Sequence, residues 1–146
     1  MNQINEARIL AAALHQVLAG SGAVQSALGN PPRLYDDAPE DPVFPYLTYG
    51  SARSEDESAD DAPMTAHILT LHLWSRYAGR AEVFDLLHII SSALHGADLS
   101  SAQQNVCALN VNYTDVFRTA DRRTLHGVLR LSVKTQPTDL PYEEAV

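Results

Sequence analysis

Six histidines are the residues in this 146-residue chain that most readily bind metals or transfer protons. His88 and His95 lie seven residues apart and share a helix face, but two turns separate them by roughly 10 Å along the axis. His67 and His72 lie in a segment with strand composition, where an odd spacing points side chains to opposite faces. Neither pair can hold an ion alone, so we expect no metal site and no cofactor.

An acidic segment between Ser54 and Pro63 is the second candidate for chemistry. Its carboxylates are Glu55, Asp56, Glu57, Asp60 and Asp61. A calcium-binding loop starting at Asp56 would need a glycine at position 61 and a closing glutamate at position 67. The chain has Asp61 and His67 there instead. We therefore expect a solvated acidic loop that binds a partner rather than a metal.

Nucleophiles are the third possibility. Asp85, His88 and Ser92 follow helical spacing, but three residues on one helix surface do not converge as the groups of a catalytic triad do. Cys107 stands in an alternating apolar segment, which favours a core position over a nucleophile. The sequence has no phosphate-binding loop and no dinucleotide glycine pattern. We predict that the protein is not an enzyme and has no catalytic residues.

Composition narrows the class of protein further. The net charge is −8, with 18 acidic against 10 basic residues, which argues against tight binding to duplex nucleic acid. No apolar run approaches the ~20 residues of a membrane-spanning helix, and the N-terminus does not have the pattern of a secretory signal. The single cysteine excludes an intrachain disulfide, so we expect synthesis in a reducing, intracellular compartment.

Hydrophobic periodicity predicts helices at three places. Apolar residues at helical spacing run from Asn5 to Gly20, where the glycine is expected to end the helix in a left-handed conformation. Val24 and Leu28 suggest a shorter helix, which ends before the Gly-Asn-Pro-Pro sequence at 29–32. The broadest apolar stripe lies between Gly79 and His95, as expected for a helix packed on a sheet.

Strand signals lie between the second and third of these helices and after the third. Strands are predicted at Arg33–Asp36, Pro45–Gly50, Thr65–Ser75, Val106–Arg118 and Leu125–Lys134, the last two as a hairpin. Leu69, Leu71 and Leu73 point to one face of the third strand, whereas Ile68, His72 and Trp74 point to the other. In the fourth strand, simple alternation predicts one apolar face made of Cys107, Leu109, Val111, Tyr113 and Phe117.

The order of these elements predicts an α+β fold. We expect a single domain with a mostly antiparallel sheet and two main helices packed on one face. This domain should span residues 1–136, with 137–146 as a loosely attached C-terminal tail, because that segment has two prolines and three acids.

Several segments, taken in order, resemble a known family. They are the N-terminal apolar helix, Pro45–Gly50, the Leu-x-Leu-x-Leu-Trp-Ser strand at Leu69–Ser75, the helix from Gly79, and Asp121–Gly127 before the last strand. This set resembles the tail-completion, or tail-terminator, proteins of long-tailed bacteriophages, prophages and gene transfer agents. The resemblance covers roughly Asn5 to Thr135.

The resemblance implies a structural role in the virion. Such proteins form a ring, expected here to be a homohexamer, at the head-proximal end of the tail tube. The ring stops polymerisation of the major tail tube protein and presents a surface to the head connector or head-closure protein. DNA passes through the lumen without specific binding, and no membrane is involved. The protein would be made in the cytoplasm of a bacterial host and located in the tail-neck region.

Two surfaces become candidates under this interpretation. Because a ring needs a second adhesive face on each subunit, Ile68, His72 and Trp74 are candidate subunit-interface residues. The five carboxylates between Ser54 and Pro63 form the candidate partner-binding loop. Two alternatives stay open: another neck component, such as a head-closure or minor tail protein, and a small metal-dependent enzyme using His88, His95 and the acidic loop.

Overall fold

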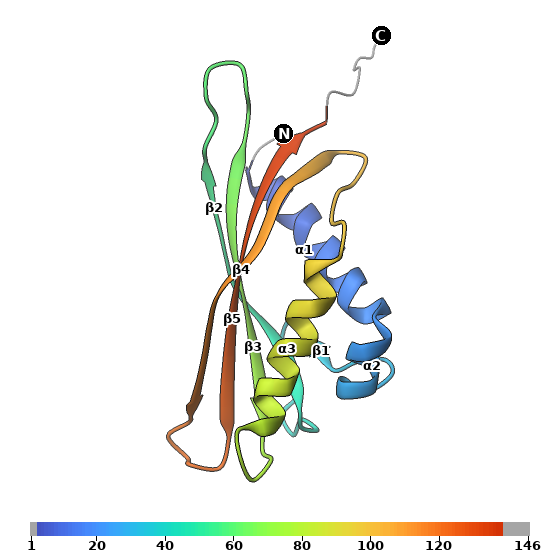
Figure 1. The fold of residues 1–146 in the computed structure, drawn as a ribbon, viewed down its shortest axis with the longest axis vertical. Coiled ribbons are helices and arrows are strands. Elements are labelled where there is room, and N and C mark those ends of the chain that lie inside the picture. Colours follow the sequence, from blue (N-terminus) through green and yellow to red (C-terminus); the bar gives the residue numbers. More distant parts are fainter. Residues whose placement is uncertain (1–2, 139–146) are drawn as a thin grey trace.

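Five strands form one sheet in the computed structural model, which describes residues 3–138 (Figure 1). The strands are β1 (Leu34–Tyr35), β2 (Tyr46–Asp56), β3 (Thr65–Ser75), β4 (Gln104–Arg118) and β5 (Leu125–Pro137), and the helices are α1 (Gln3–Gly20), α2 (Gly22–Leu28) and α3 (Ala81–His95). The sheet order is β1-β2-β3-β5-β4; β1 runs parallel to β2, and all other neighbours are antiparallel. The predicted α+β class with a mostly antiparallel sheet is confirmed.

All three helices in the described part of the chain lie on the same side of the sheet (Figure 1). Helix α3 connects β3 to β4 across this side, and β5 then returns between the two strands. The predicted hairpin of the last two strands is therefore confirmed, with Arg118 opposite Leu125. Since β5 is antiparallel to both neighbours, β3 and β4 run in the same direction.

The core lies between the helices and the leucine face of β3. Leu69, Leu71 and Leu73 are at most 4% exposed, as the two-residue period predicts. The helices bury Leu10, Leu14 and Leu18 from α1, Val24 and Leu28 from α2, and Val83, Leu86, Leu87, Ile90 and Leu94 from α3. The helical stripes read from the sequence are therefore the surfaces that cover the sheet.

Helix ends differ from the prediction at Gly20. This residue remains helical, and α2 begins at Gly22 after the N-cap Ser21, whose Oγ accepts a hydrogen bond from the Val24 amide at 3.3 Å. The glycine with positive φ is Gly29, at φ 96° after α2. Among residues 3–138 no single helix is long and apolar enough to cross a membrane, although α1 and α2, bent by 77° at their junction, reach that length and composition as a pair.

Two register shifts in β4 overturn the single apolar face predicted for that strand. They occur between Val106 and Ala108 and between Val111 and Tyr113. Each bulge adds one residue and reverses the alternation that follows. As a result Leu109 and Val111 pack against the core, as do Val106 and Val116. Cys107, Tyr113 and Phe117 are exposed instead, so the predicted core position of Cys107 is wrong.

The described end of the chain is tied to the sheet. Pro137 ends β5, and the Thr138 amide and Oγ1 donate to the carbonyls of Gln103 and Ala102 at 3.0 and 2.7 Å. The rest of the predicted C-terminal tail, residues 139–146, lies outside the described residues.

Leu71→Ala should lower the free energy of unfolding by about 2–5 kcal/mol, because Leu71 is 1% exposed and its loss leaves a cavity under the helices. Ile68→Ala, on the same strand but 37% exposed, is the matched control and should cost much less. Urea denaturation followed by circular dichroism measures both. Equal losses would mean that the two faces of β3 are equally buried.

Gly127→Ala should also destabilise the fold, by about 1–3 kcal/mol, because α3 packs closely against β5 at this glycine. An added Cβ would lie 2.7 Å from Cγ2 of Val83, a fully buried residue. Gly79→Ala serves as control, since no atom lies within 4 Å of its added Cβ. A thermal midpoint for Gly127→Ala equal to that of Gly79→Ala would contradict the close packing.

Candidate functional site

No helix or strand of residues 3–138 covers the second side of the sheet, which we call the open face (Figure 1). It consists of the side chains of β2 to β5 that point away from the helices. The structure places the three predicted interface residues there, since Ile68, His72 and Trp74 alternate with the buried leucines of β3. Ile68 is 37% exposed, and the other two are partly buried by neighbouring rings.

Four rings cross the open face side by side, one from each long strand. Tyr46 of β2 lies opposite Trp74 of β3, Trp74 opposite His126 of β5, and His126 opposite Phe117 of β4. Successive ring centroids are 6.2, 4.0 and 4.7 Å apart. We call these residues the aromatic row. Such cross-strand ring contacts stabilise the sheet. Phe117 is 42% exposed, Trp74 and His126 are partly buried, and Tyr46 is buried.

Hydrogen bonds fix the rings of the row. The indole Nε1 of Trp74 donates to Thr48 Oγ1 at 2.9 Å. His126 Nε2 and His72 Nδ1 lie 2.7 Å apart, so one imidazole donates and the other accepts. His72 fits because Gly50 lies beneath its ring: a Cβ at position 50 would lie 2.5 Å from Nε2. The glycine that ends the Pro-Tyr-Leu-Thr-Tyr-Gly segment thus makes room for the histidine pair.

Burial lowers the pKa of both paired histidines. For His72 the nearby Arg130 guanidinium adds to the lowering of the pKa. For His126 the charge of His72 adds to it, while the Asp115 carboxylate opposes it. Both imidazoles therefore favour the neutral form, in which one ring donates the hydrogen bond between them and the other ring accepts it. Sequence spacing did not reveal this pair, because the two residues are 54 positions apart.

Arginines lie near both ends of the aromatic row and further along the open face. Arg76 lies 4.4 Å above the Phe44 ring, and Arg130 lies 4.4 Å above the Tyr113 ring. Arg118, Arg122 and Arg123 lie in or beside the turn between β4 and β5. Hydrogen bonds from Thr119, Arg123 and Thr124 to Asp121 shape this turn and lower the pKa of its carboxyl to about 2. The Asp-Arg-Arg-Thr segment is therefore an ordered turn that displays positive charge.

The acidic segment lies at the other end of the sheet, in the hairpin between β2 and β3. The prediction of a loop from Ser54 is wrong for 54–56, because β2 continues to Asp56, opposite Thr65. Glu57 forms an ion pair with Lys134 at 3.1 Å, and Glu55 pairs with Arg53 at 3.4 Å. Ser58 donates to Asp56, which lowers the pKa of that carboxyl. Within residues 3–138 no group of three His, Cys, Asp or Glu side chains could hold a metal ion.

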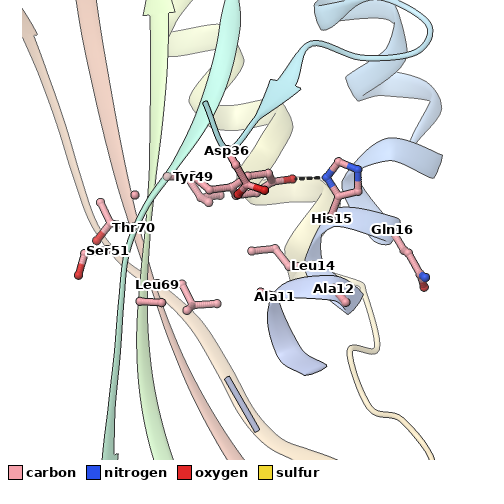
Figure 2. Close-up of a pocket in the computed structure, with 13 residues that line it drawn as sticks. Ala11, Ala12, Leu14, His15, Gln16, Asp36, Tyr49, Ser51, Leu69 and Thr70 are labelled. Carbon is pink, nitrogen blue, oxygen red and sulfur yellow. Dashed lines mark hydrogen bonds between the residues drawn. The ribbon is translucent and has the colours of Figure 1, made fainter. Parts of the chain in front are cut away.

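A cavity of about 500 Å³ lies between α1 and β2 (Figure 2). The Tyr49 hydroxyl points from β2 across it to His15 of α1, with 2.8 Å between Oη and Nδ1. Burial and then the Asp36 carboxylate raise the pKa of Tyr49, so the phenol stays protonated. Small and apolar residues such as Ala11, Ala12 and Leu14 form much of the wall. The arrangement provides a hydrogen bond between helix and sheet and contains no activated nucleophile.

His67 occupies a second polar site, inside the core. Its Nδ1 lies 2.7 Å from Ser54 Oγ and its Nε2 lies 2.8 Å from Thr135 Oγ1. Burial lowers the pKa of His67, and the Glu6 carboxylate opposes this. The prediction that His67 and His72 face opposite sides is confirmed. His67 links β2, β3 and β5 and is enclosed by them.

The polar residues of α3 belong neither to the His72–His126 pair nor to the site around His67. Asp85, His88, Ser92 and His95 are exposed on the outer surface of the helix. No hydrogen bond within residues 3–138 joins them to one another. The structure therefore does not bring together the triad-like or metal-like sets that were considered from the sequence.

The structure is thus an α+β domain with one ring-lined sheet face that no helix or strand of the described residues covers. The family model described as tail completion protein gp17 matches residues 12–136, and the chain belongs to this family. It is therefore a component of a phage-type virion with a structural role in the tail. A chain from the structure "Virion of native gene transfer agent (GTA) particle" has the same fold, with a TM-score of 0.76 and 21% identity over 86% of this chain and 92% of that chain. No curated protein matches the sequence.

Acidification should destabilise the fold through the histidine pair. Below the ordinary pKa of 6.5 the unfolded chain takes up protons that the folded pair, with its lowered pKa values, does not bind. Stability should thus be full above pH 7 and decline as the pH falls to 5. In the double variant His72→Gln and His126→Gln the decline should be shallower, whereas His95→Gln, on the exposed side of α3, should keep the wild-type slope. Urea midpoints between pH 5 and 8 measure this; an unchanged slope in the double variant would contradict it.

Proposed function

We propose that this chain is a tail-terminator subunit. Copies assemble into a hexameric ring at the head-proximal end of the tail tube, stop polymerisation of the tube protein, and offer a surface to the head connector or head-closure protein. The observation that carries the proposal is membership of the tail completion family over residues 12–136.

The open face supplies the surface that such assembly needs. A ring is built from heterologous contacts, in which each subunit presents two different surfaces. We assign one of these to the open face, with Ile68, His72 and Trp74 in the subunit interface. Trp74 is suited to the centre of the contact, because its ring is held between Tyr46 and His126 and its polar nitrogen is already bonded.

The charge of the protein is compatible with a conduit for DNA. A net charge of −8 disfavours adhesion of the passing duplex to the ring. The acidic carboxylates Glu55, Asp56, Glu57, Asp60 and Asp61 form the proposed partner-binding hairpin. In this function no residue needs to perform catalysis.

The function is tested by removing the gene from a particle-producing strain. The expected defects are tails of uncontrolled length or heads without tails, seen by electron microscopy. Gold-labelled protein should lie at the neck; a label at the distal tail tip would instead identify a different tail component. Purified protein that stays monomeric even when mixed with tail-tube protein would contradict the proposal.

Trp74→Ala should weaken ring assembly by roughly 10- to 30-fold while leaving the domain folded. Phe84→Ala is the matched control, because Phe84 is an aromatic residue that is 51% exposed on α3, on the helix side of the sheet. Light scattering coupled to size-exclusion chromatography measures the assembly, and circular dichroism checks the fold. If folded Trp74→Ala assembles as well as Phe84→Ala does, Trp74 does not lie in the interface.

A further inference from the structure

Positive charge is concentrated at the end of the sheet where the aromatic row lies. Four of the ten basic residues of the chain lie there: Arg76 directly after β3, and Arg118, Arg122 and Arg123 in or beside the turn between β4 and β5. The two ion pairs between side chains of residues 3–138 involve Arg53 and Lys134, so none of the four forms one. The nearby Asp121 is engaged by the hydrogen bonds of its own turn. This end of the sheet therefore combines rings with four guanidinium groups that have no ion-pair partner among the described residues, and Asp115 is a carboxylate on the same face near His126.

Negative charge is concentrated at the opposite end of the same strands. The hairpin between β2 and β3 carries five carboxylates within seven positions, from Glu55 to Asp61. Only Glu55 and Glu57 have ion-pair partners within the described residues, which leaves Asp60 and Asp61 at the tip without one. The other acidic stretch, 36–41, follows β1, at the sheet edge furthest from β4.

The two charged ends cannot meet within one molecule. Strand β3 has 11 residues, and at ~3.3 Å per residue its ends lie roughly 35 Å apart. Figure 1 shows the β2–β3 hairpin at one end of the long axis and the β4–β5 turn at the other. Ordered strands join the two ends, so the hairpin cannot fold back. A complementary protein surface for either end can come only from another molecule, and a second copy of this chain carries both.

We infer that the acidic hairpin of one copy docks on the aromatic row and the neighbouring arginines, Arg76, Arg118, Arg122 and Arg123, of the next copy. The contact is head-to-tail, and head-to-tail contacts form a closed ring when the rotation between neighbours permits it. The inference rests on the proposed ring and assigns its subunit contact. In this contact the arginine guanidinium groups form paired hydrogen bonds with the hairpin carboxylates, and the neighbouring rings exclude water.

Two charge-reversed variants test this contact. The hairpin variant carries Glu55→Lys and Asp61→Lys, and the turn variant carries Arg118→Glu and Arg123→Glu. All four residues are exposed. Asp60 and Arg122 are left unchanged because their φ angles are positive, at 48° and 62°. Arg8→Glu and Asp85→Lys, on the helix side, are the matched control.

Each variant alone should lose at least tenfold in association, since like charges now face each other. A 1:1 mixture should regain assembly, because every reversed hairpin can then meet a reversed turn. Native mass spectrometry should show rings with alternating, equal numbers of the two variants. Assembly of wild type should also weaken as salt rises from 50 to 500 mM.

The outcomes separate this contact from the proposed function. Rings formed equally well by either variant alone, or a mixture without recovery, would overturn the head-to-tail contact and leave the ring itself in place. A wild-type chain that never forms rings, even with tail-tube protein, would overturn both. Wild-type protein that binds a duplex oligonucleotide through Arg118 and Arg123 instead of a second copy would also overturn the inference.

Discussion

The two-residue period of β3 is the constraint on which the structure depends. Because all three helices in the described chain pack on one side, every second residue of this central strand is buried, and the intervening residues form the outer surface. Leu69, Leu71 and Leu73 fill the centre of the buried side, Thr65, His67 and Ser75 lie toward its ends, and His72 and Trp74 belong to the outer surface. A slip of one residue would exchange core and surface, so the core and the open face are fixed by the same register.

The open face gains its chemical character from residues distant in sequence. Tyr46, Trp74, His126 and Phe117 come from four strands and are aligned by direct cross-strand pairing. The aromatic row is thus a product of topology, in particular of β5 lying between β3 and β4. The same arrangement brings the arginines of the β4–β5 turn beside Arg76, which follows β3.

Local patterns predicted the elements of the fold well, because helical stripes and strand alternation are short-range signals. The helices, the hairpin and the shared face of Leu69, Leu71 and Leu73 were readable in this way. The face of Cys107 was not, since a bulge leaves little trace in single-sequence alternation and reverses every later residue. The His72–His126 contact was equally hidden, because it requires knowing which strands are neighbours. Family resemblance carried the functional interpretation, which no motif of catalysis or metal binding supplied.

Strand β1 has only two residues, and it pairs with β2 at Leu47 and Thr48 alone. Beyond these positions β2 is an edge strand, and a strand of another molecule could add to it by backbone hydrogen bonds and start uncontrolled fibre growth. The register shift between Tyr49 and Ala52 bends this edge strand, and Glu55 and Asp56 place charge along it. Both features oppose strand addition. The proposed self-association is thereby left to side-chain surfaces, whose geometry can limit the number of copies.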